Sequence, residues 1–270
     1  MLLAAIGLAG CAAPATTPSH TAPTWKRVWI DTFDGAAGLP PPARWSADTG
    51  GDGWGNRELE YYTPGSQNAS LDGRGHLVLT ADKSNQDLAC WYGRCEFTSA
   101  RLTTAPSSTV RYGRIEARMK VPVGAGLWSA FWMLGAPTAP NNWPNDGEID
   151  IAENIGSEPA TVHGSLHGPG YAGLDSLTAT FTTPSGEPLS SRFHTYAIIW
   201  SRSSIEYLVD GEVYAIQTPD TTRGNRWVFD RPFSLILNLA VGGTWPGSPA
   251  TSTVFPAQLV VDYVAVYRRS

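Results

Sequence analysis

The 270-residue chain is long enough for one large β domain or two small domains, and it is 42% hydrophobic. Only 16% of its residues are charged, the net charge is −5, and there is no basic stripe, which argues against nucleic acid as a partner. The same balance argues against an anionic polymer as substrate. Eleven Trp and ten Tyr are many for this length, and flat aromatic rings either pack in cores or stack on sugar rings.

The first residues predict export. Residues 1–10 are small and apolar, and the sequence Leu8-Ala9-Gly10-Cys11 where they end resembles the lipobox of bacterial lipoproteins. About ten apolar residues suit a signal peptide and are too few to span a membrane. We expect residues 1–10 to be a lipoprotein-type signal peptide and Cys11 to carry a lipid anchor, the only link to a membrane. The alternative is an ordinary secretory signal with an incidental cysteine, and both predict an exported protein, either on the cell surface or secreted.

The remainder divides into a tether and one domain. Residues 11–24 are rich in Pro, Thr and Ala, a composition typical of a semi-extended linker. Residues 25–270 show one composition throughout, with no internal repeat and no sustained helical period. We therefore predict a single domain over 25–270 that acts as a monomer.

The domain is predicted to be all-β. Apolar alternation or continuous apolar runs predict strands, and Asp210-Gly211 predicts a tight hairpin between two of them. Short strands separated by turn residues, without alternating helices, favour an antiparallel sandwich or β-jelly roll. Two curved sheets would bury their apolar faces and leave a concave outer face as a cleft for a long substrate. The strands are expected at 25–33, 77–80, 115–121, 194–200, 204–209, 212–217, 233–241 and 259–268.

Cys90 and Cys95 flank a four-residue turn. A disulfide is plausible in an exported protein, whereas a metal site needs more ligands than one such pair offers. We predict a local disulfide of modest stabilising effect, with free thiols as the alternative.

The chemistry is predicted to lie in residues 147–154, which contain Glu148, Asp150 and Glu153 among apolar residues. Side chains alternate between the faces of a strand, so Glu148 and Asp150 share one face and Glu153 is out of phase. A one-residue β-bulge between Asp150 and Glu153 would bring all three acids to one face. An edge strand with a solvated acidic face is the alternative.

Paired carboxylates on one face suit glycoside hydrolysis. In a retaining enzyme, one carboxylate attacks the anomeric carbon while the other protonates the leaving oxygen and then activates water. The two carboxyl groups must approach to about 5–5.5 Å, so Glu148 and Glu153 have to lean together across Asp150. A close like charge raises the pKa of its neighbour, as a general acid requires.

The chain resembles glycoside hydrolase family 16, in particular its bacterial laminarinases. Residues 147–154 are similar to the bulged form of the family's E-[IL]-D-I-x-E signature. The resemblance extends from about residue 29 to residue 267. Its other ordered segments are 55–63, 112–118, 126–135, 238–247 and 261–267.

This resemblance implies a β-jelly roll that performs retaining endo-hydrolysis of a neutral β-1,3-glucan and needs no cofactor. It implies that Glu148 is the nucleophile, Glu153 the acid/base, and Asp150 the residue that orients and tunes both. Mixed-linkage β-1,3-1,4-glucan or another β-glycan is the alternative substrate, and a glycan-binding protein without activity is a third reading. The implied substrate-binding residues are Asn56, Glu58, Trp128, Trp132, His167, Asn238 and Trp245. Of these, Trp128 and Trp132 could instead pack in the core, and His167 could be an ordinary polar residue.

Three positions depart from the family pattern. Glu60 stands where Gln is usual, and Thr244 where Asn is common. Thr32 replaces a frequent Glu that helps to hold a structural Ca²⁺ on the convex face. The Gly73 carbonyl and the Asp262 carboxylate could still contribute, although Ca²⁺ takes more oxygen ligands than these two.

Overall fold

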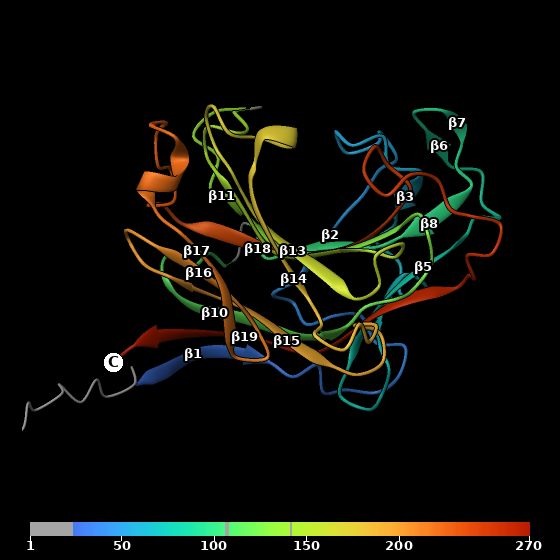
Figure 1. The fold of residues 1–270 in the computed structure, drawn as a ribbon. Helices are drawn as coiled ribbons and strands as arrows, with labels where there is room; N and C mark the ends of the chain where they lie inside the picture. Colours follow the sequence, from blue (N-terminus) through green and yellow to red (C-terminus); the bar gives the residue numbers. More distant parts are fainter. Residues whose placement is uncertain (1–23, 106–107, 141) are drawn as a thin grey trace, which may run out of the picture.

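The computed structural model describes residues 24–105, 108–140 and 142–270, which form two stacked β-sheets (Figure 1). The predicted signal peptide, Cys11 and all of the predicted tether except Thr24 lie outside the described residues. Regular structure consists almost entirely of strands, with two short 3-10 helices, η1 (Gly173–Asp175) and η2 (Pro219–Thr222). Neither helix in this part of the chain is long and apolar enough to cross a membrane.

The larger sheet has ten strands, of which β1, β10, β15 and β19 form the lower layer in Figure 1. Eight follow the order β17-β16-β15-β10-β19-β5-β8-β3, while β1 pairs with β19 and β4 with β5. Their bounds are β1 (Trp25–Asp31), β3 (Glu60–Tyr62), β4 (Ala69–Leu71), β5 (Leu77–Lys83), β8 (Phe97–Ser99), β10 (Gly113–Lys120), β15 (His194–Trp200), β16 (Ile205–Val209), β17 (Glu212–Gln217) and β19 (Ala257–Arg269).

The smaller sheet has seven strands in the order β14-β13-β12-β11-β18-β9-β2. Its strands are β2 (Ser46–Asp48), β9 (Arg101–Thr103), β11 (Leu127–Gly135), β12 (Glu148–Ile155), β13 (Thr161–His167), β14 (Leu177–Thr182) and β18 (Phe233–Val241). A separate hairpin pairs β6 (Ala89–Cys90) with β7 (Gly93–Arg94).

The strands confirm the predicted antiparallel sandwich, with one exception. The predicted bounds of β15, β17 and β18 are those observed, and the remaining predicted strands differ by a few residues at their ends. The exception is the β3–β8 pair, which is parallel. A parallel pair needs a long crossover, and the residues between these two strands supply one through β4 and β5.

The core lies between the two sheets, and alternation along the strands decides which residues enter it. On β11, Phe131 and Met133 point inward with no exposed surface, and on β18 Leu235, Leu237 and Leu239 do the same. The residues that alternate with these on β11 and β18, such as Trp132 and Asn238, must point to the outer face of the seven-stranded sheet. This face therefore receives the polar and aromatic side chains of β11, β12 and β18.

Truncating Leu237 to Ala should lower the free energy of unfolding by about 2–5 kcal/mol, because the cavity lies between two rigid sheets and cannot collapse. Chemical denaturation measures the change. Val254→Ala is the matched control, since Val254 is 73% exposed, and it should stay within about 0.5 kcal/mol of the wild type. A similar effect for both variants would contradict the assignment of the core.

Candidate active site

A β-bulge at Ile151 brings the three acids to one face, as predicted. Asp150 lies opposite Trp132 on β11, but Ala152 lies opposite Phe131, so Ile151 is the extra residue. On the other side, Asp150 pairs with Ser165 and Glu153 with His163, with the register shift between them. Ile151 itself turns into the core. The extra residue restores the phase of Glu153, which then shares the outer face with Glu148 and Asp150.

Glu148 and Glu153 each accept a hydrogen bond from a tryptophan. The indole N–H of Trp143 donates to Glu148 Oε2 at 2.6 Å. The indole N–H of Trp128 donates to Glu153 Oε1 at 3.1 Å. Both donors are uncharged, so they orient the carboxyl groups without adding a formal charge to the site.

Asp150 is contacted by His167, whose tautomer is set by the backbone. The N–H of Gly173, in η1, donates to His167 Nδ1 at 3.0 Å, so this ring nitrogen is an acceptor. The proton of the neutral ring is then on Nε2, which lies 3.0 Å from Asp150 Oδ2. His167 therefore lies beside the buried Asp150, while its part in substrate binding stays a prediction.

The three carboxyl groups cannot all be ionised together. Burial, and then the charge of Asp150, raise the pKa of Glu148 from 4.5 to about 8. Burial raises the pKa of Asp150 from 3.8 to about 7, opposed by its hydrogen bond with Glu148. Burial and the charge of Asp150 also raise the pKa of Glu153 well above 4.5. At neutral pH the cluster therefore keeps protons that it can transfer, the property required of a general acid.

A hydrogen-bonded chain leads away from the acids across the sheet. The indole N–H of Trp132 donates to Asn238 Oδ1 at 2.7 Å, and Asn238 Nδ2 donates to the hydroxyl of Tyr62 at 3.1 Å. The Tyr62 hydroxyl donates to Glu58 Oε2 at 2.9 Å, and Asn56 Nδ2 donates to Glu58 Oε1 at 3.1 Å. This chain joins four of the predicted binding residues in one network.

Arg101 was not predicted from the sequence as a site residue, although it contacts Trp132 at one end of the hydrogen-bonded chain. Its guanidinium lies between the rings of Trp54 and Trp132, 4.6 and 4.7 Å from their centroids. Arg101 Nε also pairs with Asp48 Oδ2 at 3.0 Å. A cavity of about 340 Å³ opens beside this pair, and its lining includes Trp143, Asn142 and Gly147.

Trp245 lies beyond Glu153 and is 41% exposed. Its ring meets Trp128 edge to face, with centroids 5.3 Å apart, and lies 4.9 Å from the ring of His163. Trp128 and Trp132 are half-buried on the outer face, so neither is a core residue. An exposed indole beside the acids offers an apolar surface of the kind on which sugar rings stack.

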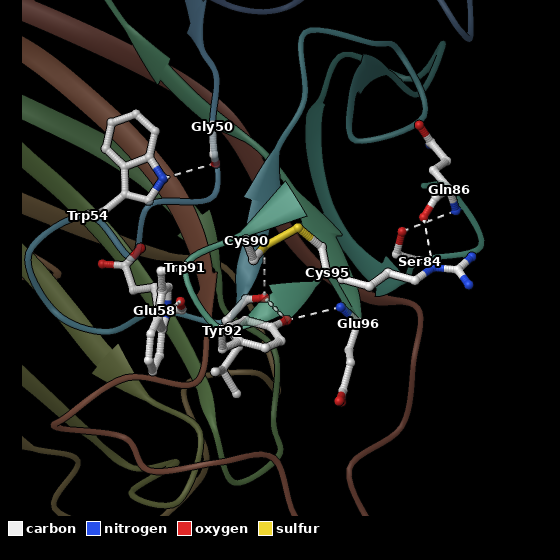
Figure 2. Close-up of a disulfide and its surroundings, with 12 residues drawn as sticks. Gly50, Trp54, Glu58, Ser84, Gln86, Cys90, Trp91, Tyr92, Cys95 and Glu96 are labelled. Carbon is white, nitrogen blue, oxygen red and sulfur yellow. Dashed lines mark hydrogen bonds between the residues drawn. A yellow bond between two sulfur atoms is a disulfide. The ribbon is translucent and has the colours of Figure 1, made fainter. Parts of the chain in front are cut away.

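The Cys90–Cys95 disulfide closes a loop that holds the segment carrying Glu58 (Figure 2). Within the loop, the indole N–H of Trp91 donates to the Glu58 carbonyl at 2.7 Å, and the Tyr92 hydroxyl donates to the Leu59 carbonyl at 2.6 Å. The loop thereby fixes the backbone from which Glu58 reaches the hydrogen-bonded chain.

Of the two residues offered as calcium ligands, Asp262 has another partner. The carboxylate of Asp262 is paired with the guanidinium of Arg118, and the hydroxyl of Thr32 donates to Asp34 at 2.6 Å. Because Ca²⁺ takes six to eight oxygens, this arrangement does not fit a calcium site built from Gly73 and Asp262. Calcium binding by the chain stays a prediction.

Within the described part of the chain, the one group of His, Cys, Asp or Glu side chains spaced for a metal consists of Glu148, Asp150 and His167, with ligand atoms within 4.8 Å. His167 Nε2 carries a proton in the tautomer set by Gly173. In this tautomer, that nitrogen has no lone pair free for a metal.

Fold and site together define a class of protein. The outer face of the β-sandwich carries a pair of glutamates flanking an aspartate, with aromatic side chains along the sheet, as in glycoside hydrolases. The model of the family described as Glycosyl hydrolases family 16 matches residues 57–265. The chain belongs to this family.

Individual relatives agree over nearly the whole chain. This protein is 41% identical to a protein of Rhodothermus marinus named β-glucanase, and the alignment covers 97% of this chain and 91% of the relative. The solved structure of an endo-β-1,3-glucanase from Pyrococcus furiosus superimposes with a TM-score of 0.85 and 42% identity, covering 92% and 96% of the two chains. The laminarinase catalytic domain from Thermotoga maritima gives a TM-score of 0.84 and 41% identity, covering 91% and 99%. The fold is thus the family's β-jelly roll.

Replacing Trp143 with Phe should raise the pKa of Glu148 above about 8, because the indole N–H stabilises the carboxylate. A hydrogen bond to a charged group of about 1.5–3 kcal/mol corresponds to about one to two pKa units. NMR titration of isotopically labelled glutamate side chains measures the shift. Trp227→Phe is the control, since its indole nitrogen has no hydrogen-bond partner among the described residues. An unchanged Glu148 pKa in Trp143→Phe would show that the bond does not stabilise the anion.

Proposed function

We propose that the protein is an endo-β-1,3-glucanase that hydrolyses laminarin-type glucan with retention of configuration. The observation that carries the proposal is the placement of Glu148, Asp150 and Glu153 on one face by the Ile151 bulge. The similar proteins are a β-glucanase, an endo-β-1,3-glucanase and a laminarinase by name, which supports the same substrate class.

In the proposed first step, Glu148 Oε attacks the anomeric carbon, and Glu153 gives its proton to the leaving glycosidic oxygen. Glu153 is suited to this task because its raised pKa keeps it protonated. Glu148 must be ionised to attack, and the hydrogen-bonded Asp150 can take up the proton that the two share. The indole N–H of Trp143 holds the resulting carboxylate.

In the second step, the ionised Glu153 removes a proton from a water molecule that attacks the glycosyl-enzyme ester. Glu148 leaves as the carboxylate, and Glu153 regains its proton. Two inversions at the anomeric carbon give net retention. The Trp128 N–H, which bonds to Glu153, stabilises the carboxylate that exists between the two steps.

Substrate binding is proposed to use both ends of the outer face. Asn56, Glu58, Asn238 and Trp132 form the hydrogen-bonded chain and would bind sugar hydroxyls on one side of the acids. Trp128 and the exposed Trp245 would stack on sugar rings near Glu153. The charge of Arg101 is met by Asp48, so this surface suits a neutral polysaccharide.

We also propose that the mature protein works outside the cytoplasm as a monomer, held at the cell surface through Cys11. The apolar residues 1–10 followed by a cysteine support the lipid anchor. The Cys90–Cys95 disulfide supports an oxidising compartment, where such bonds persist.

Product analysis tests the proposed substrate. The protein should release short oligosaccharides from the interior of laminarin and curdlan, and it should cut lichenan, a mixed-linkage glucan, more slowly. Chromatography of the early products against time measures both rates. Preferential cleavage of lichenan would favour the β-1,3-1,4-glucanase alternative and contradict the proposal.

Glu148→Gln is the inactive control in this assay, because the amide cannot attack the anomeric carbon. It should abolish hydrolysis while glucan binding persists. Glu212→Gln, an exposed position on β17 in the other sheet, should be fully active.

A further inference from the structure

Two buried glutamates lie side by side behind the hydrogen-bonded chain. Glu58 is 3% exposed and Glu60 is fully buried, at the start of β3. Glu58 and Glu60 are two residues apart, so in extended chain their side chains share a face, and the charge of Glu58 acts on Glu60. Two buried carboxylates side by side would repel strongly, so the pair must hold a proton.

The hydrogen-bond donors around the pair decide which carboxyl group holds this proton. Both oxygens of Glu58 accept bonds, Oε1 from Asn56 and Oε2 from the Tyr62 hydroxyl. Glu60 Oε2 accepts the N–H of Val241 at 2.7 Å, but Glu60 Oε1 has no donor among the described residues. A buried oxygen without a donor can be satisfied as a hydroxyl. The proton therefore belongs on Glu60 Oε1, from which it can be donated to Glu58.

The other charged and titratable groups near the pair agree with this assignment. Burial raises the pKa of Glu58 as well, but hydrogen bonds from Asn56 and Tyr62 and the charge of Arg101 oppose this rise. Tyr62 and Tyr92 also face the pair electrostatically, and burial raises the pKa of both phenols, so they stay neutral donors. Burial, then the charge of Glu58, raise the pKa of Glu60 well above 4.5. The pair thus carries one negative charge, on Glu58.

We propose that Glu60 is a positioning residue that acts as a protonated acid, donating a hydrogen bond that holds the Glu58 carboxylate in place at the sugar-binding end of the site. The inference rests on the proposed function in taking Glu58 as a substrate-binding group. Through Tyr62 and Asn238, the position of Glu58 is linked to Trp132 on the central strands. Loss of the proton from Glu60 would place two anions side by side, and their repulsion would displace the Glu58 carboxylate from its hydrogen bonds with Asn56 and Tyr62.

The proton on Glu60 can be tested without any substrate. A carboxyl group whose pKa is higher in the folded protein than in the unfolded chain stabilises the fold fully below the unfolded pKa, and this stability is lost as pH rises. Glu60→Gln keeps the shape, with an amide N–H to donate to Glu58, but cannot titrate. The quantity to follow is the unfolding equilibrium constant of the wild type divided by that of Glu60→Gln. This ratio should rise about tenfold per pH unit from about pH 5 to about pH 8, and it should level off above the pKa of Glu60.

Chemical denaturation of both proteins across this pH range measures the ratio. Glu58→Gln is the matched variant, because it removes the neighbouring carboxyl group and leaves Glu60 buried. Its unfolding constant divided by that of Glu60→Gln should therefore still rise with pH. A ratio of wild type to Glu60→Gln that stays constant would show that Glu60 is not protonated, and it would overturn the proposal.

Kinetics test the positioning role. Glu60→Gln should keep the wild-type KM on laminarin oligosaccharides within about twofold at pH 6, because the amide replaces the donor. Glu60→Leu has no donor and should raise KM about tenfold or more, with kcat changed far less, as expected for the loss of a bond to a charged group. An equal rise of KM in Glu60→Gln would contradict the proposal.

The two proposals fail in different ways. If the wild type cleaves no β-glucan, the proposed function is wrong, whereas the denaturation ratio still reports on the proton of Glu60. If the wild type is active but the ratio is constant, only the role of Glu60 is wrong.

Discussion

One extra residue in β12 is the constraint on which the site depends. Without Ile151 in the bulge, strict alternation would place Glu153 among the core residues of the sandwich, where an unpaired carboxylate is strongly unfavourable. With it, three acids share the outer face, two of them half-buried and Asp150 buried. Ile151 packs in the core, so apolar burial holds the bulge that directs the acids outward.

Crowding three carboxyl groups disfavours their joint ionisation, and the two glutamates are hydrogen-bonded by uncharged indole N–H groups. Each acid has an aromatic N–H nearby: Trp143 at Glu148, Trp128 at Glu153 and His167 at Asp150. Lysine or arginine in these places would favour full ionisation of all three acids. An indole N–H orients a carboxyl group and leaves its proton available, which the proposed exchange of protons needs. The same logic recurs at Glu58 and Glu60, where hydroxyl and amide donors surround a pair with one charge.

Much of this could be predicted from the sequence because it depends on local order. The odd spacing of Glu148, Asp150 and Glu153 required a bulge, and the apolar run 233–241 required a central strand, and both are present. Arg101 and Trp143 could not be assigned in this way. Arg101 acts through Trp54, Asp48 and Trp132, which are distant in sequence. Trp143 reaches Glu148 from a loop, although its position five residues before the acid was a usable signal.

Other differences have equally specific causes. Strands of three residues such as β3 and β8 are too short for a readable alternation, so their parallel pairing was not foreseen. The suggested calcium ligand Asp262 is paired with Arg118, a contact that no spacing rule indicates. Glu60 stood out in the sequence only as an unusual residue, and its burial against Glu58 gives that departure a physical meaning.

The central claim is that Glu148 is the nucleophile of a double displacement, and trapping its ester tests this most directly. A β-glucan oligosaccharide activated at the anomeric carbon and fluorinated at the adjacent carbon should form the glycosyl-enzyme ester faster than water removes it. Peptide mapping by mass spectrometry should then find one sugar adduct, on Glu148. An adduct on Glu153, or steady turnover of natural glucan by Glu148→Gln, would contradict the account.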